Sequence, residues 1–215
     1  MMARRRCGPV TGLLGGSFNP AHGGHRRISL LAMEALALEE VWWLVSPGNP
    51  LKPIDGMAPL AARAISAGRE AKRARIRVTA IERELGTRYT VDTLGALLRR
   101  YPKRRFVWLM GADNLAQFHK WNNWRAIAKL MPIAVIARPG YERSARASPA
   151  MSWLRRSVRP AGQAKNWTRW RLPALVLLRF RPDPTSATSL RAADPAWHRQ
   201  YLPPPKSHRT GLSNP

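Results

Sequence analysis

Cysteine, acidic side chains and long apolar segments are all scarce in this sequence. Cys7 is the only cysteine in 215 residues, so no internal disulfide can form, and this cysteine usage fits a reducing cytoplasm. No uninterrupted apolar run approaches the roughly 20 residues that a membrane-spanning helix needs. The basic start followed by a short apolar stretch resembles a signal peptide, but Gly8, Pro9 and Gly12 interrupt that stretch. We therefore expect a cytoplasmic protein without a membrane anchor.

The shortage of acid leaves a strongly basic chain. Thirty-seven basic residues against 12 acidic ones give a formal net charge of +25, which suits polyanionic ligands. The basic residues are mostly arginine and are spread along the chain, as an arginine-rich genome would also produce, so we expect no dedicated nucleic-acid site. A stacking surface for RNA could lie only in residues 141–173, where arginines alternate with Trp167 and Trp170. We interpret that stretch as a variable surface segment.

The order of apolar runs predicts an α/β fold. Strand-like runs occupy residues 10–14, 41–45, 76–81, 106–110, 131–137 and 175–180. Helical spacing occurs between them, at residues 25–38, at 59–72 and from Thr90 onward. This alternation predicts an open, mostly parallel sheet with helices on both faces. Ligands of such sheets bind at the carboxyl ends of the strands.

The chain is long enough for one such domain. We assign residues 10–194 to it, with residues 141–173 as the variable segment inside it. Residues 1–9 are then a basic extension, and residues 195–215, which are rich in proline and small polar residues, are expected to be a flexible tail. The oligomeric state is left open, and a homo-oligomer is compatible with the sequence.

Residues 15–25 carry the most specific pattern, a glycine-rich strand-to-helix turn with two histidines. Gly15 and Gly16 allow the backbone to pass close to a ligand, and Gly24 clears space beside His22 and His25. Free backbone N–H groups and the positive end of the helix dipole would face that ligand. Taken alone, the two histidines could equally be ordinary turn residues. The turn as a whole indicates a phosphate site.

The complete string G-G-S-F-N-P-A-H-G-G-H resembles the signature of nucleotidyltransferases with an H-x-G-H motif. Its opening is most similar to that of the bacterial nicotinate-nucleotide adenylyltransferases, and the resemblance extends over about residues 11–194. It implies a Rossmann-like nucleotidyltransferase fold. It also implies transfer of the AMP part of ATP to nicotinate mononucleotide, with release of pyrophosphate, in NAD biosynthesis. His22 and His25 would supply positive charge around the α-phosphate.

Further motifs of the family imply an ATP site. The first signature contributes Gly15, Gly16, Ser17, Phe18 and Gly24. The G-A-D match contributes Asp113, which could bind ribose hydroxyls or, as an alternative, cap a helix. The second signature, in which Ala187 and Leu190 replace the usual serine and isoleucine, contributes Ser186, Thr188 and Arg191 as phosphate contacts. Mg²⁺ would arrive with ATP, because no carboxylate pair in the sequence could hold it alone.

The resemblance also implies a mononucleotide site. Thr90 would belong to the nicotinate pocket, although it could also be a helix N-cap. Trp121 would stack on the pyridine ring, and Arg138 would hold the phosphate. Asn49 and Lys52 would line the same site, next to Leu51, which stands where the family usually has histidine.

We expect the acid mononucleotide to be preferred over the amide. The helix start at Thr90 offers donors to a carboxylate, and the nearest acidic side chain expected there is Asp92. A dual-specificity enzyme, another mononucleotide adenylyltransferase, a cytidylyltransferase and a pantetheine-phosphate adenylyltransferase remain alternatives within the superfamily. The motifs around Thr90 and Trp121 argue against the last two. A different alternative is a basic RNA-binding module on an inactive nucleotide fold.

Overall fold

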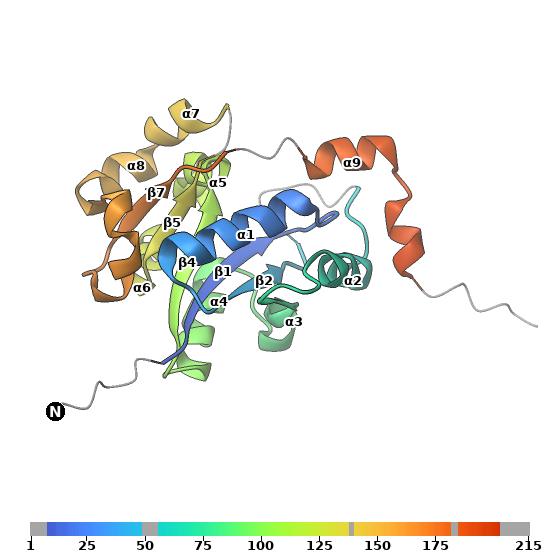
Figure 1. Ribbon diagram of the computed structural model, residues 1–215, viewed down its shortest axis with the longest axis horizontal. Coiled ribbons are helices and arrows are strands. Elements are labelled where there is room, and N and C mark those ends of the chain that lie inside the picture. Colours follow the sequence, from blue (N-terminus) through green and yellow to red (C-terminus); the bar gives the residue numbers. More distant parts are fainter. Residues whose placement is uncertain (1–7, 49–55, 138–139, 182–184, 203–215) are drawn as a thin grey trace, which may run out of the picture.

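A computed structural model describes residues 8–48, 56–137, 140–181 and 185–202. Its centre is a seven-stranded sheet in the order β3-β2-β1-β4-β5-β7-β6 (Figure 1). Every neighbouring pair of strands is parallel. The strands are β1 (Val10–Gly16), β2 (Glu40–Val45), β3 (Ile76–Thr79), β4 (Arg105–Gly111), β5 (Ile133–Ile136), β6 (Val158–Arg159) and β7 (Leu175–Leu178).

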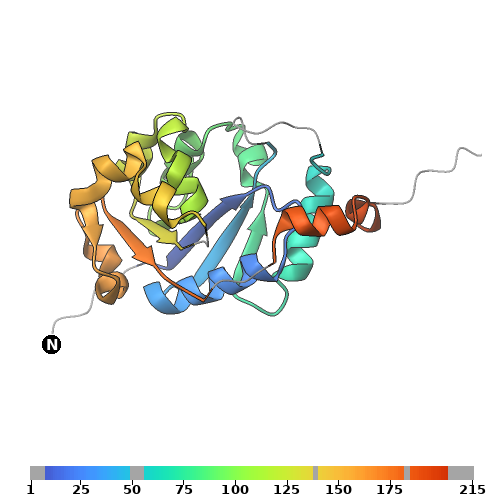
Figure 2. The ribbon, with the colours of Figure 1, turned by 90° about the horizontal axis from the view of Figure 1, so that it is seen from above.

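The helices cover both faces of this sheet, as Figure 2 shows from above. The α-helices are α1 (Gly23–Leu36), α2 (Leu60–Glu70), α3 (Ile81–Leu85), α4 (Thr90–Arg100), α5 (Ala112–Gln117), α6 (Trp124–Leu130), α7 (Glu142–Arg146), α8 (Pro149–Leu154) and α9 (Ala187–Ala193). Four short 3₁₀ helices are η1 (Phe118–Lys120), η2 (Arg155–Ser157), η3 (Ala161–Arg169) and η4 (Trp197–Tyr201).

Two hydrophobic cores lie on opposite faces of the sheet because successive strand residues point to opposite sides. Trp42 packs in one core with residues of α4, α5 and α6. Its neighbour Trp43 packs in the other core with residues of α1 and α2. Both indoles are fully buried. The central strands are apolar at nearly every position because a sheet covered on both faces has no solvent side.

The strand order reverses at the centre of the sheet, and this places the ligand site. The chain proceeds outward from β1 to β2 and β3, returns to β4 beside β1, and continues to β5. Neighbouring loops therefore part at the carboxyl ends of β1 and β4, which opens a crevice there. The expected fold class, an open parallel sheet with helices on both faces, is confirmed.

The local structure differs from the sequence prediction at several boundaries. The strand expected at residues 76–81 ends at Thr79, because Ile81 turns into α3 and is buried. The two-residue β6 was not predicted. Residues assigned to the tail form η4, with Trp197 buried and the Tyr201 ring covered by the Arg69 guanidinium at 4.6 Å. Ordered structure thus extends past residue 195.

Trp167, which in the RNA-binding alternative would belong to a stacking surface in residues 141–173, is buried. This side chain is 2% exposed, and its Nε1 donates to the carbonyl of Leu36 at 2.9 Å. Trp170 packs against the same core. The Trp167 indole therefore attaches η3 to α1 and is not exposed for stacking on bases. Among the described residues, no helix is long and apolar enough to cross a bilayer.

Candidate active site

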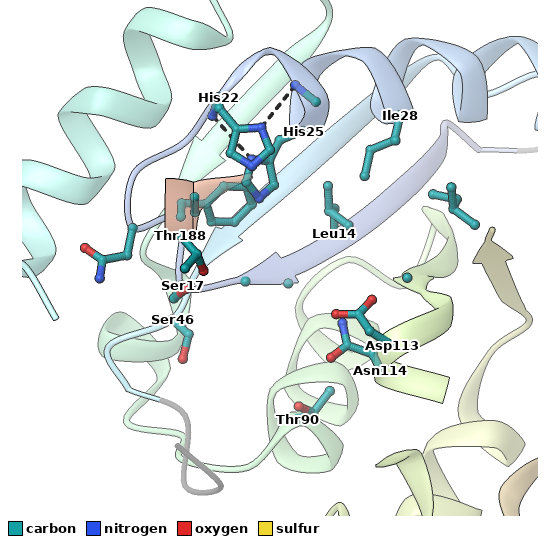
Figure 3. A pocket seen from close by; sticks show the side chains of 18 of the residues that line it. Leu14, Ser17, His22, His25, Ile28, Ser46, Thr90, Asp113, Asn114 and Thr188 are labelled. Carbon is teal, nitrogen blue, oxygen red and sulfur yellow. Dashed lines mark hydrogen bonds between the residues drawn. The ribbon is translucent and has the colours of Figure 1, made fainter. Parts of the chain in front are cut away.

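A cavity of about 840 Å³ opens at the carboxyl ends of β1, β2 and β4. Figure 3 shows its walls, with the imidazoles and Thr188 on one side and Asp113 on another. Twelve residues that the sequence selected line it, namely Gly15, Gly16, Ser17, Phe18, His22, Gly24, His25, Thr90, Asp113, Trp121, Thr188 and Arg191. Residues more than 150 positions apart in the chain thus meet in one site.

His22 and His25 are fixed to the first turn of α1 by reciprocal capping. His22 is the N-cap, and its Nδ1 accepts the backbone N–H of Gly24 at 3.1 Å. The Nδ1 of His25 accepts the backbone N–H of His22 at 3.3 Å. The two ring centroids lie 4.0 Å apart. The helix start therefore presents both imidazoles to the cavity as one unit (Figure 3).

The capping contacts also assign the tautomer of each ring. A nitrogen that accepts a backbone N–H must keep its lone pair, so the ring proton belongs on Nε2. In this arrangement Nε2 carries the N–H donor of each ring. The sequence analysis expects positive charge from these histidines, and Nε2 can also offer hydrogen bonds to developing negative charge.

Two glycines are required by close packing. A Cβ on Gly24 would lie only 2.8 Å from Cε1 of His22. The absence of a side chain at Gly24 therefore leaves room for the His22 imidazole. A Cβ on Gly15 would lie 2.5 Å from the ring of Trp108. The sequence analysis had given that space to a ligand. The absence of a side chain at Gly15 therefore allows the Trp108 indole to pack against β1 at the base of the cavity.

A buried layer that the sequence analysis missed supports His25. The Phe18 ring packs against the rings of His25 and Trp43, with centroids 4.9 Å and 5.0 Å away, and the centroids of those two rings lie 6.0 Å apart. Nε1 of Trp43 donates to Oγ of Ser29, which donates to the carbonyl of His25, both at 2.8 Å. Trp43 and Ser29 are fully buried. The β2 strand thereby braces the first turn of α1.

Asp113, Thr90 and Trp121 form the remaining walls. Asp113 is the second residue of α5, whose N-cap is Gly111, so Asp113 is not the N-cap residue. A Cβ on Gly111 would lie 2.3 Å from Oδ1 of Asp113. Thr90 is the first residue of α4, and the cap is Tyr89, so the N-cap prediction for Thr90 was wrong. Trp121 is half-buried, with its ring edge-on to Trp108.

The second signature occupies α9. Thr188 lines the cavity, and Arg191 donates to its Oγ1 at 3.3 Å and to the carbonyl of Asn19 at 2.6 Å. Ser186 does not line the cavity. Its Oγ accepts the backbone N–H of Ser189 at 3.1 Å as the N-cap of α9. Ser186 therefore caps α9, and its contact with phosphate stays a prediction.

Glu82 is a cavity-lining acid that the sequence analysis overlooked. Burial raises the pKa of its carboxyl to about 6, although a hydrogen bond with Ser46 opposes the shift. Asp92, the acid that had been expected nearest to the site, is exposed and does not line the cavity. A short strand-to-helix junction gives no local sequence signal for such a carboxyl. Asn49, Leu51, Lys52 and Arg138 lie outside the described residues.

Comparisons with known proteins identify the family. Residues 13–193 match the cytidylyltransferase-like family model. A protein of Erythrobacter litoralis named probable nicotinate-nucleotide adenylyltransferase is 66% identical over 191 residues, 89% of this chain and 87% of its own. The chain belongs to the nicotinate-nucleotide adenylyltransferase family. It is therefore a nucleotidyltransferase, as the motifs predicted.

Two further comparisons concern a second relative with the same name and a solved structure. A relative from Cereibacter sphaeroides with the same name is 50% identical over 183 residues, 85% of this chain and 96% of its own. The structure of Plasmodium falciparum nicotinic acid mononucleotide adenylyltransferase complexed with NaAD covers 86% of this chain and 83% of that one, with a TM-score of 0.63 at 14% identity. That similarity shows a shared fold.

Proposed function

We propose that this enzyme joins nicotinate mononucleotide to the AMP part of ATP, giving nicotinate adenine dinucleotide and pyrophosphate. The mononucleotide phosphate attacks the α-phosphorus, a new P–O bond forms, and the bond to the β-phosphate oxygen breaks. The main support is the convergence of both nucleotidyltransferase signatures on one cavity of a chain that belongs to this family. The nucleophile is already an anion, so the protein needs to provide alignment and charge stabilisation.

His22 and His25 are proposed to donate from Nε2 to the oxygens of the α-phosphate as their charge grows. Thr188 and Arg191 hold the outer phosphates of ATP, Asp113 accepts from the ribose, and the backbone of residues 15–18 and Gly24 lies along the nucleotide. Trp121 and Thr90 receive the pyridine ring. From the sequence pattern alone, we propose Ser186 for the outer phosphates and Asn49, Lys52 and Arg138 for the mononucleotide.

Mg²⁺ is proposed to enter on the triphosphate. Within the described residues, no group of three His, Cys, Asp or Glu side chains could hold a metal ion. Mg²⁺ prefers several oxygen ligands and keeps some of its waters, so phosphate oxygens suit it. When bound, it would neutralise charge on the departing pyrophosphate.

Preference for the acid mononucleotide is proposed to come from the helix start at Thr90. Where Glu82 is ionised near the carboxylate of the substrate, it opposes this preference, because like charges repel. We expect nicotinate mononucleotide to be used at least ~10-fold more efficiently than the amide, or about 1.4 kcal/mol in the transition state. Thr90→Val should narrow this gap, and Trp121→Ala should weaken both substrates alike.

The test supplies purified protein with ATP, magnesium and a panel of mononucleotides and follows pyrophosphate release. Greatest kcat/KM with nicotinate mononucleotide supports the proposal. Equal values for acid and amide would indicate a dual-specificity enzyme. No turnover, together with tight RNA binding at physiological salt, would favour the RNA-binding alternative, for which the buried Trp167 gives no support.

A further inference from the structure

Arg63 on α2 is a buried cation held by backbone carbonyls. Its side chain is 1% exposed, and among the described residues no carboxylate forms an ion pair with it. Nε donates to the carbonyl of Ala58 at 2.8 Å. Nη1 donates to the carbonyls of Ser17 and Ser46 at 2.7 and 2.6 Å, and Nη2 donates to that of Pro47 at 3.2 Å. Burial lowers the pKa of this guanidinium.

The four carbonyls belong to separate segments beside the cavity. Ser17 lies in the β1–α1 turn, Ser46 and Pro47 follow β2, and Ala58 precedes α2. Ser17 and Ser46 line the cavity, whereas Arg63 does not. The guanidinium therefore lies behind the wall and fastens these segments to each other. Hydrogen bonds from a charged, desolvated donor are among the stronger ones in proteins.

These contacts fix the direction of two peptide groups. In a planar trans peptide, the C=O of one residue and the N–H of the next point in opposite directions. With the carbonyl of Ser17 turned back to Arg63, the N–H of Phe18 points away from it, toward the cavity side. The carbonyl of Pro47 orients the N–H of Gly48 in the same way. Phe18 and Gly48 both line the cavity.

The backbone of Phe18 indicates that its orientation is imposed. Its φ is +47°, in the left-handed region that a residue with a side chain seldom adopts. Such a conformation persists where surrounding contacts determine it. Here the Phe18 ring is buried against His25 and Trp43, and the carbonyl before it is held by Arg63.

We propose that Arg63 is a positioning residue that turns the backbone N–H groups of Phe18 and Gly48 into the cavity as donors to substrate phosphate. Arg63 itself does not touch the substrate. The identity of the anion as nucleotide phosphate rests on the proposed function. The site would bind polyphosphate through main-chain dipoles whose direction one guanidinium sets.

Binding of inorganic tripolyphosphate to the full-length protein, measured by calorimetry, tests this without requiring any reaction. Arg63→Lys keeps the charge but cannot reach four separate carbonyls, so it should weaken binding about tenfold. Arg69→Lys is the matched control, because Arg69 is on the same helix and covers Tyr201. Millimolar guanidinium should restore part of the tripolyphosphate binding of Arg63→Ala. No restoration is expected if the substitution only destabilises the fold.

Unchanged tripolyphosphate binding by folded Arg63→Lys would overturn the proposal. If the Arg63 variants do not fold, substitutions at Gly48 test the proposal, because apart from its chain neighbours no atom of the described residues lies within 4 Å of a Cβ added there. Gly48→Pro, which lacks the N–H, should bind tripolyphosphate at least about fivefold more weakly than Gly48→Ala. Equal binding by these two would refute it. Failure of the mononucleotide assignment alone would leave these results unchanged.

Discussion

The two segments that carry the nucleotidyltransferase signatures are built in different ways. The β1–α1 turn is braced from behind by Phe18, Trp43 and Ser29, all of them buried. Helix α9 has no buried residue and lies at the α2 end of the molecule (Figures 1 and 2). It is held at its ends, by Arg191 on the carbonyl of Asn19 and by η4 packed on α2.

This difference suggests a division of work between the segments. Groups that stabilise a transition state must be held in place before the reaction, because moving them costs free energy at the critical step. Groups that bind the outer phosphates equally in ground and transition states affect KM more than kcat. We expect the braced turn to control kcat and α9 to control ATP binding.

The largest effect should come from removing an imidazole of the braced turn. His25→Ala removes an Nε2 donor and half of the capping pair, so kcat should fall on the order of 100-fold with a smaller change in KM for ATP. Steady-state kinetics of the folded variant measure this. His198→Ala is the control, since His198 is on η4 and does not line the cavity. An unchanged kcat would exclude the proposed role of His25.

Arg191→Ala should change KM for ATP more than kcat, which is the reverse of the effect expected for His25→Ala. It removes a cation beside Thr188, so KM for ATP should rise about tenfold, which corresponds to one charged hydrogen bond, while kcat changes less. Titrating ATP at saturating mononucleotide gives both constants. Arg199→Ala, which changes an exposed residue of η4, supplies the comparison. A loss confined to kcat would remove the contrast between the two segments.

Ser29→Ala tests the brace itself. It leaves the buried Nε1 of Trp43 without its acceptor and removes the hydroxyl hydrogen bond to the carbonyl of His25. We expect a loss of about 1–3 kcal/mol in unfolding free energy and a decrease of kcat by a few-fold. Urea unfolding and steady-state kinetics report the two quantities. Ser144→Ala removes an exposed hydroxyl contact and should change neither; if both variants behave alike, the buried chain does not support His25.

The smallest effect concerns Glu82. Because burial raises its folded pKa from 4.5 to about 6, the folded state binds the proton more tightly than the unfolded state. The stabilisation is therefore complete below pH 4.5 and is lost as pH rises toward 6, by about 1–2 kcal/mol. Glu82→Gln should abolish this dependence in urea unfolding at pH 5 and 8. Glu84→Gln, exposed on the same helix, should retain it.

Much of the fold could be predicted because apolar runs and turn residues are local signals. The central strands and the glycine-rich turn were found where the sequence indicated. Strand ends could not be predicted to the residue, because an apolar side chain such as that of Ile81 fits a strand as well as a helix. The burial of Trp167 depends on a hydrogen bond to Leu36, 131 residues away, and no local pattern reports such a contact.

The site was predicted through its motifs and missed where motifs are silent. In the sequence, Arg63 resembles any surface arginine of an amphipathic helix; only the structure shows that carbonyls of two distant segments and of nearby Ala58 accept its hydrogen bonds. Glu82 follows a strand as many exposed acids do. Trp43 could be distinguished from Trp42 only after the register of β2 showed which indole faces α1. Side chains that act through tertiary contacts produce no characteristic residue spacing that could be recognised in the sequence.

The most direct test of the account follows the α-phosphorus of ATP. The purified enzyme is given ATP labelled at the α-phosphate, magnesium and nicotinate mononucleotide, and the products are separated. We predict that the label appears in nicotinate adenine dinucleotide, in equal amount to unlabelled pyrophosphate, and that His25→Ala slows its appearance. Label in pyrophosphate, or label in AMP without dinucleotide, would contradict transfer of the adenylyl group.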